Sequence, residues 1–351
     1  MSDYMGQSNP DIVILHLSDL HFGPYLQGVS KIGEWSQFAP PHDFNLLQGM
    51  ETKVIEILQK FKGLLIVTVT GDMTTAAEPP AYESVNNYLR DNPFVSSRIR
   101  VGLELHEIPI GIYIVPGNHD VWLYGNLLTR WKGYANRKDQ YFKYFPDQLP
   151  NAYPLLINGN SITIYTLDTN RVGGVNPLNF TNVLGRGGVG KQQIGEIQTL
   201  HNNLRSSTFQ GIPKDFNYGS SLKILLMHHH LELPSNIPDS IEQKLMRLYD
   251  ASSILNLLCE IGIHIILCGH QHFPYQIPNL QSPSYPNHSI FLSCAGSATQ
   301  IDCDRNSFYC YEITNSHNGT YNLRVLLYEA DAKNNDYFFK ESSALTFVIK
   351  S

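Results

Sequence analysis

The chain has 351 residues, of which 42% are hydrophobic and 16% charged, and this is enough apolar material for a sizeable core. The net charge of −6 and the lack of a long basic run disfavour nucleic acid and anionic membranes as partners. The polar N-terminal segment and the lack of a long apolar run indicate a cytoplasmic protein without a signal peptide or a membrane span.

Runs rich in Val, Ile and Leu predict buried strands that alternate with helices. The expected strands are 12–17, 64–69, 112–115, 162–167, 222–227 and 263–267. Apolar residues at helical spacing predict helices over 47–61, 191–204 and 251–259. Strands that alternate with helices in this way indicate an α/β architecture.

The pattern changes from about residue 286. Four further strands are expected over 289–294, 308–313, 321–327 and 344–349, with no helical pattern between them. We expect an antiparallel meander that completes a second sheet of the same domain. The chain would then form one domain over 1–351, with a core at about 11–300 and the C-terminal strands at about 301–351.

Five short polar motifs each follow one of the expected strands. They are Asp19-Leu20-His21, Gly71-Asp72, Gly117-Asn118-His119-Asp120, His228-His229-His230 and Gly269-His270-Gln271-His272. Since open α/β sheets bind ligands beyond the carboxyl ends of their strands, we expect these side chains to meet there. Asp19 and His21 are two residues apart, as are His270 and His272, so in extended chain each pair projects to one side.

Most of these motifs are weak signals when taken singly. A lone Asp-x-His or His triplet can be ordinary surface, and Gly-Asp usually marks a turn. Gly117-Asn118-His119-Asp120 is more specific, because its chance occurrence is on the order of one in a thousand. The five motifs follow one another in a meaningful order, and each comes directly after an expected strand. This combination favours a metal site over a chance distribution of polar residues.

The order D-x-H, G-D, G-N-H-D, H and G-H-x-H resembles the calcineurin-like metallophosphoesterase superfamily over residues 19–272. The segment 188–204 with Gln193, the strand end Leu167-Asp168-Thr169 and the His triplet are similar to its class III cyclic-nucleotide phosphodiesterase branch. The resemblance implies a four-layer α/β/β/α sandwich of two mixed sheets flanked by helices, with a dinuclear metal site at the strand ends.

The resemblance also implies two divalent metal ions, for which Mn, Fe and Zn are the candidates. One ion would be held by Asp19, His21, Asp72 and His272, and the other by Asp72, Asn118, His228 and His270. Asp72 and a water or hydroxide would bridge them. His228 is preferred to His229 because it stands nearest the strand end, but the choice stays open, as does the role of His230.

In that family the residue at the position of His119 stands beside the substrate instead of binding metal. It would bind a phosphate oxygen or protonate the leaving alkoxide, and we expect Asp120 to orient its ring and raise its basicity. Asn118 and Arg171 are further candidates for substrate contacts. The implied activity is hydrolysis of small phosphodiesters, with cyclic nucleotides among the candidate substrates.

Three alternatives stay open: a phosphomonoesterase, a nuclease that acts on DNA ends, and a non-catalytic scaffold. The acidic balance disfavours the nuclease, and the complete set of motifs disfavours the scaffold. Loops over 22–42, 172–190 and 273–288 are expected to frame the site and to set specificity. The segment 185–192 nearly matches a P-loop, but Gln192 stands where Ser or Thr is required, which disfavours an NTPase.

Overall fold

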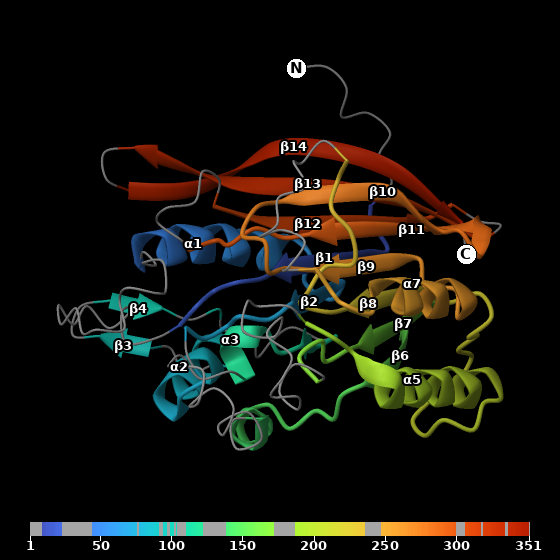
Figure 1. The fold of residues 1–351 in the computed structure, drawn as a ribbon. Coiled ribbons are helices and arrows are strands. Elements are labelled where there is room, and N and C mark those ends of the chain that lie inside the picture. Colours follow the sequence, from blue (N-terminus) through green and yellow to red (C-terminus); the bar gives the residue numbers. More distant parts are fainter. Residues whose placement is uncertain are drawn as a thin grey trace.

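Two six-stranded sheets lie at the centre of the protein (Figure 1). The computed structural model describes residues 9–22, 44–75, 77–90, 94–96, 99–101, 103, 110–121, 138–171, 187–235, 247–299, 306–316, 319–333 and 336–350. The first sheet has the order β14-β13-β12-β1-β2-β5, and the second has the order β10-β11-β9-β8-β7-β6. A separate antiparallel pair is formed by β3 (Phe94–Ser96) and β4 (Ile99–Val101).

The first sheet joins three parallel strands to an antiparallel meander. Its strands are β1 (Ile12–Leu17), β2 (Leu65–Val69), β5 (Ile112–Ile114), β12 (Ser307–Asn315), β13 (Thr320–Lys333) and β14 (Asp336–Lys350). We had expected the strands after residue 301 to complete the second sheet. They extend the first sheet instead. β12 runs antiparallel to β1, which is buried along its whole length and gains from β12 a partner for its second edge.

The second sheet has parallel strands in its centre and an antiparallel strand at each edge. Its strands are β6 (Asn151–Ile157), β7 (Asn160–Thr166), β8 (Leu222–Leu226), β9 (Ile265–Cys268), β10 (Tyr275–Ser282) and β11 (Tyr285–Cys294). The prediction of a loop over 273–288 was wrong, because most of this segment forms the hairpin β10–β11. Pro278 hid the strand pattern, but β10 is an edge strand with irregular pairing, where proline is tolerated.

Helices cover the outer face of each sheet (Figure 1). They are α1 (Phe44–Lys60) and α2 (Pro79–Arg90) on the first sheet, α5 (Gly190–Arg205) and α7 (Ala251–Glu260) on the second, and the single turn α3 (Asn118–Val121) after β5. One apolar cluster joins α1 and α2 to the first sheet, another joins α5 and α7 to the second, and a third fills the space between the sheets. The predicted four-layer α/β/β/α sandwich is confirmed.

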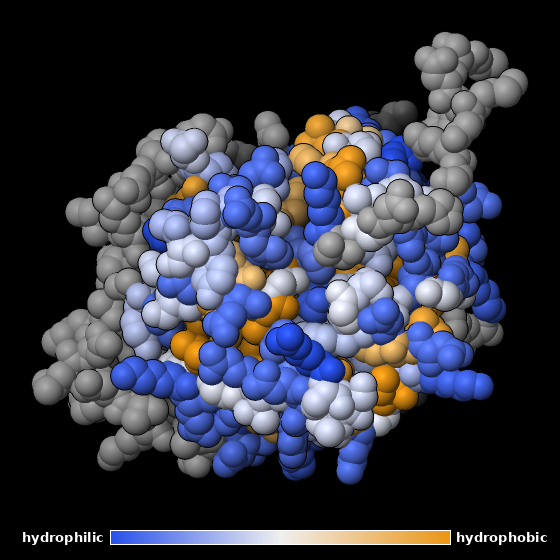
Figure 2. Space-filling model, turned by 90° about the vertical axis from the view of Figure 1, so that its right-hand side faces the viewer, coloured by the Kyte–Doolittle hydropathy of each residue, from blue (hydrophilic) through white to orange (hydrophobic). Residues whose placement is uncertain are grey.

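The surface on the side of α5 and α7 is mixed in character. Hydrophobic residues show there as separate areas between hydrophilic ones (Figure 2). Within the described ranges, no helix has the length and hydropathy needed to cross a membrane.

Candidate metal centre

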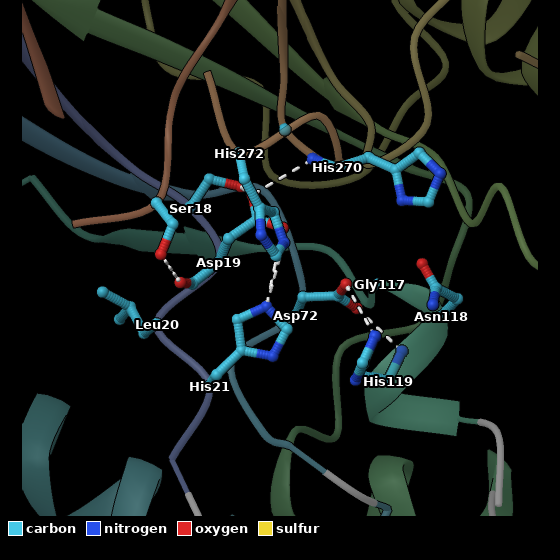
Figure 3. Close-up of polar contacts among 12 residues, drawn as sticks. Ser18, Asp19, Leu20, His21, Asp72, Gly117, Asn118, His119, His270 and His272 are labelled. Carbon is cyan, nitrogen blue, oxygen red and sulfur yellow. Dashed lines mark hydrogen bonds and ion pairs between the residues drawn. The ribbon is translucent and has the colours of Figure 1, made fainter. Parts of the chain in front are cut away.

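The five motifs converge at the carboxyl ends of the parallel strands, and Figure 3 labels residues of four of them. Asp19, Asp72 and Asn118 follow β1, β2 and β5 of the first sheet, whereas His228 and His270 follow β8 and β9 of the second. Two groups of donor atoms result, and within each group all atoms lie within 4.8 Å of one another. The first group is Asp19, His21, Asp72 and His272, and the second is Asp72, His228 and His270. Asp72 belongs to both groups.

In the first group, one carboxylate oxygen and two imidazoles face each other. His272 Nε2 lies 3.2 Å from both His21 Nε2 and Asp19 Oδ1. The other oxygen of Asp19, Oδ2, accepts hydrogen bonds from the Ser18 hydroxyl at 2.6 Å and from the His270 N–H at 3.1 Å. These bonds fix the carboxylate so that Oδ1, which accepts no hydrogen bond from the described residues, is directed at the two rings.

The second group is built around His228. Its Nε2 lies 3.3 Å from Asp72 Oδ2 and 3.2 Å from both Asn118 Oδ1 and His270 Nδ1. Its other ring nitrogen, Nδ1, is 2.7 Å from the carbonyl oxygen of Thr70. Since Nδ1–H donates to this carbonyl, the lone pair of the neutral ring is on Nε2, where the other donors meet it.

These distances fit metal coordination. Bonds of about 2.1 Å to an ion such as zinc place neighbouring ligand atoms about 3.0–3.4 Å apart, whether the geometry is octahedral or tetrahedral. The 3.2–3.3 Å separations between His272 and His21, and between His228 and its neighbours, lie in this range. Asn118 brings the donors to seven side chains, and with Asp72 shared they offer eight bonds, four for each of two divalent ions.

The charges of the second group also call for a cation. Burial lowers the pKa of His228, but the carboxylate of Asp72 outweighs burial and raises this pKa to about 9. Burial opposes ionisation of Asp72 too, yet His228 and His119 hold the pKa of Asp72 below its ordinary range. A divalent ion at this position would supply the positive charge that the carboxylate of Asp72 attracts.

The three consecutive histidines have different surroundings. Of the three, His228 is the one that joins a donor group among the described residues. His229 Nδ1 lies 2.7 Å from the hydroxyl of Thr169, and His230 Nδ1 lies 3.2 Å from the side-chain nitrogen of Gln271. The geometry therefore favours His228 as the ligand, and it places His230 beside the fifth motif.

The backbone of the donor residues is unusual. Five of them have φ between 48° and 77°, in the left-handed region: Asp19, His21, Asp72, His270 and His272. Such conformations cost of order 1–3 kcal/mol each and cluster at functional sites. Neither pair lies in an extended chain as expected, although Asp19 and His21 do join the same donor group. His270 and His272 join different groups.

Close packing explains two glycines of the motifs. A Cβ at Gly117 would lie 2.1 Å from Asp72 Oδ1, and a Cβ at Gly269 would lie 2.6 Å from Asp19 Oδ2. Any side chain at these positions would push against a carboxylate that belongs to a donor group. Positions 117 and 269 therefore require glycine, because the backbone there passes close to the carboxylates of Asp72 and Asp19.

Gly117→Ala is expected to lower the free energy of unfolding by about 1–3 kcal/mol and to reduce the bound metal, because the new methyl group displaces Asp72. Gly195→Ala is the matched control, since a Cβ there meets nothing within 4 Å, and α5 should be stabilised by up to about 1 kcal/mol. Denaturant titration and elemental analysis would check both variants. Similar behaviour of the two would contradict the packing argument.

His119 stands beside the donors without belonging to either group within the described residues. Its Nδ1 is 3.1 Å from the carbonyl oxygen of Thr75, so Nδ1–H donates there. Nε2 lies 3.9 Å from Asp72 Oδ2 on the other side of the ring. Burial lowers the pKa of His119, and the charge of Asp72 partly opposes this. The ring is thus positioned to exchange a proton at Nε2.

Asp120 has a different role from the expected one. Its carboxylate accepts four hydrogen bonds of 2.8–3.2 Å, from the N–H groups of Gly117, Met73 and Thr74 and from the Thr74 hydroxyl. The prediction that Asp120 orients the ring of His119 was wrong, since Thr75 holds that ring. Asp120 instead ties the turn of its own motif to the segment after Asp72. Burial raises the pKa of Asp120 to about 7.

The cations near the end of β7 are paired. Arg171, a candidate for substrate contacts, forms an ion pair with Glu196. Lys138 Nζ lies 3.2 Å from Asp168 Oδ2, and Lys138 and Arg171 both line a cavity of about 700 Å³. Most of the expected loops over 22–42 and 172–190 lies outside the described residues.

A carboxylate occupies the N-terminus of α5. Asp250 Oδ2 accepts hydrogen bonds from the N–H groups of Gly190 at 2.8 Å and Val189 at 3.1 Å. A phosphate held in the manner of a P-loop would need such N–H groups. Asp250 therefore supports the exclusion of an NTPase, although residues 185 and 186 of the near-match lie outside the described residues.

Sequence reasoning missed the residues that hold the donors in place. Ser18 adjoins the first motif and acts through its hydroxyl, so a search for polar residues beside each motif would have found it. Thr70 and Thr75 act through their backbone carbonyls, and these leave no signal in the side-chain pattern.

Comparisons with known proteins agree with this geometry. A family model described as calcineurin-like phosphoesterase matches residues 12–274. No curated protein matches the chain. The solved structure of PhoD is 12% identical over 98% of this chain and 71% of its own, with a TM-score of 0.54.

Two further solved structures are similar. Purple acid phosphatase PPD1 from yellow lupin (Lupinus luteus) seeds is 15% identical over 96% of this chain, with a TM-score of 0.52, and this chain spans 55% of its length. GAP50 of Plasmodium, described as the anchor in the inner membrane complex, is 11% identical over 97% of this chain and 89% of its own, with a TM-score of 0.48. At the identities of PhoD and the lupin enzyme, the likeness shows the fold.

Proposed function

Because the chain belongs to the calcineurin-like phosphoesterase family, we propose that it hydrolyses phosphodiesters of small molecules with two divalent metal ions. The observation that carries the proposal is the sharing of Asp72 between two donor groups, with His119 Nε2 3.9 Å from the same carboxylate. Two bound divalent ions would lower the pKa of a water molecule and neutralise charge on the phosphate.

Residues of both sheets would hold each ion. The proposed sets are Asp19, His21, Asp72 and His272 for one ion, and Asp72, Asn118, His228 and His270 for the other. Mixed carboxylate, amide and imidazole donors suit Mn, Fe or Zn better than calcium, which prefers oxygen alone. These three metals are the ones to compare when the chelated protein is reloaded.

His119 would give a proton to the leaving alkoxide. Its Nδ1–H is committed to Thr75, so the exchangeable proton is carried on Nε2. The backbone N–H of His119 donates to Asp72 Oδ1 at 2.7 Å, which fixes the ring relative to the shared carboxylate. Asp120 stabilises this arrangement, because its carboxylate accepts hydrogen bonds from the backbone N–H groups of Met73 and Thr74.

The paired cations favour a diester over a monoester. A monoester dianion gains most from an added Arg or Lys, which forms charge-assisted hydrogen bonds with the extra negative charge. Arg171 and Lys138 are already paired with Glu196 and Asp168. A diester monoanion would need the metals and His119 alone.

The value of kcat/KM for bis(4-nitrophenyl) phosphate is therefore expected to exceed that for 4-nitrophenyl phosphate, measured with Mn²⁺ at the same pH. Arg171→Ala should leave the diester rate unchanged, because the guanidinium is held by Glu196. A preference of the wild type for the monoester would indicate a phosphomonoesterase.

Two further measurements address the remaining alternatives. A salt-sensitive mobility shift with short DNA would favour the nuclease. Failure of the metal-loaded protein to cleave either nitrophenyl ester would favour the scaffold.

A further inference from the structure

A second cavity lies at the opposite end of β8 from the metal donors. Its volume is about 590 Å³, and it is lined by the C-terminal turn of α5, by residues of the segment 207–219 and by Lys223. Lys223 is the second residue of β8, whereas His228 follows the last one. Five residues of extended chain separate them, which is about 16 Å. The cavity is thus distinct from the metal centre.

The side chain of Lys223 is largely buried, its ammonium group is accessible from the cavity, and it has no charged partner among the described residues. It is 7% exposed, and its ammonium group has no hydrogen bond or ion pair with the described residues. The group lies over the ring of Tyr218, 4.7 Å from the ring centroid. Burial lowers the pKa of Lys223 to about 8, and no carboxylate offsets this effect. Lysine is almost never buried in this way unless something pairs with it.

The aromatic floor beneath the ammonium is fixed by hydrogen bonds. The hydroxyl of Tyr218 lies 2.6 Å from His201 Nδ1 and 2.7 Å from the hydroxyl of Tyr165. These two hydrogen bonds hold the Tyr218 ring in its position beneath the Lys223 ammonium. The ring attracts the cation without neutralising its charge, so the ammonium can still bind an anion in the cavity.

The rest of the lining combines apolar walls with exposed charges. Leu204, Ile212 and Phe216 supply the apolar surface. Arg205 also lines the cavity and has no ion pair within the described part of the chain. The acidic lining residues, Asp215 and Glu260, are exposed, so Lys223 is the buried charge of this lining.

We propose that this cavity binds a small organic anion, with a carboxylate or phosphate group on Lys223 Nζ and an apolar or aromatic body against Leu204, Ile212 and Phe216. The volume lies within the range of about 300–1,000 Å³ that small-molecule sites occupy. An ammonium group above the ring of Tyr218, with apolar side chains around it, matches a ligand that has an anionic head and an apolar body.

Calorimetric titration with three probes that share one ring tests the proposal. Benzoate carries a carboxylate, phenylphosphonate carries a phosphorus oxyanion on a bond that phosphoesterases do not hydrolyse, and benzylamine carries a positive charge. We expect at least one of the two anions to bind and benzylamine not to bind. Tighter binding of benzoate would indicate a carboxylate ligand, and tighter binding of phenylphosphonate would indicate a phosphate ligand. Failure of both anions to bind would overturn the proposal.

Variants assign the binding to this cavity. Lys223→Met keeps the chain length but removes the charge, and it should weaken anion binding by about 10- to 100-fold. Lys214→Met is the matched control. Lys214 is an exposed residue of the segment 207–219, which contributes to the cavity, but Lys214 itself is not part of the lining. Asp72→Asn separates this site from the metal centre, since it should leave binding in the cavity intact. Equal affinity in the Lys223 and Lys214 variants would overturn the proposal.

Thermal stability distinguishes ligand binding from a structural role. A structural Lys223 would neutralise the C-terminal turn of α5, and Lys223→Met would then lower Tm. Our proposal expects Tm not to fall, because the Lys223 ammonium has no ion pair with the described residues that the substitution could break. Benzoate or phenylphosphonate should raise the Tm of the wild type but not that of Lys223→Met. The wild type and Lys223→Met should have the same phosphoesterase activity. Failure of this proposal would therefore not affect the proposed function of the metal centre.

Discussion

Replacing His119 with alanine is expected to lower turnover by about 10²–10⁴-fold while both metal ions stay bound. The ring faces the shared carboxylate of Asp72 but belongs to neither donor group within the described residues. Its loss should therefore remove a proton donor without removing a ligand. The effect should be larger for alkyl esters than for nitrophenyl esters, because nitrophenolate leaves readily without a proton.

Elemental analysis and a series of leaving groups would check the role of His119. His288→Ala is a suitable control, since that half-buried ring bonds the carbonyl of Ile263 at 2.7 Å and joins neither donor group of the described residues, and full turnover should remain. Loss of metal from His119→Ala would identify His119 as a ligand. An equal loss for all leaving groups would mean that His119 binds the phosphate or positions the substrate.

Asp72→Asn is expected to reduce the metal content from two ions per chain to less than one. Asp72 is the residue that both donor groups share, so weakening it disturbs both ions. Turnover should fall by more than the 10²–10³-fold, or about 3–4 kcal/mol, that loss of one electrostatic donor costs. Metal analysis of the purified variant, together with the rate for a nitrophenyl diester, measures both effects.

Two comparisons make the test of Asp72 specific. His21→Ala should remove mainly one ion, because His21 belongs to the first group alone. Asp168→Asn alters another buried carboxylate, which follows β7 and pairs with Lys138, and this variant should keep two ions. If Asp72→Asn retained two ions, or Asp168→Asn lost them, the shared-ligand assignment would be wrong.

The strands that carry the motifs could be predicted because buried parallel strands leave continuous apolar runs. β1 has the expected bounds, and β8 ends one residue earlier than expected. β6 was missed, although Asn158-Gly159 between β6 and β7 is a strong hairpin signal, because its residues are only partly buried and its pattern is mixed. Local patterns also could not say which sheet β12 joins, since its partner β1 is almost 300 residues away in sequence.

The identity of the donors could be predicted better than the way they are held. Side-chain chemistry singles out Asp72 and His228, but the left-handed backbone of Asp19 and His272 depends on turns that residue types alone do not specify. Three of the four hydrogen bonds to Asp120 come from backbone N–H groups, two of them in the segment after β2. Backbone groups are the same in every residue type, so sequence patterns carry no information about them.

β1 lies between β2 and β12, and this position bears on the length of chain that must be present for the metal centre to form. The family match ends at residue 274, before β12 begins at Ser307. A fragment that stopped at the match would keep every proposed ligand, yet the strand that delivers Asp19 would present a row of unpaired N–H and C=O groups. Such a fragment would offer a template for edge-to-edge association between molecules, so we expect the smallest autonomous unit to include the C-terminal meander.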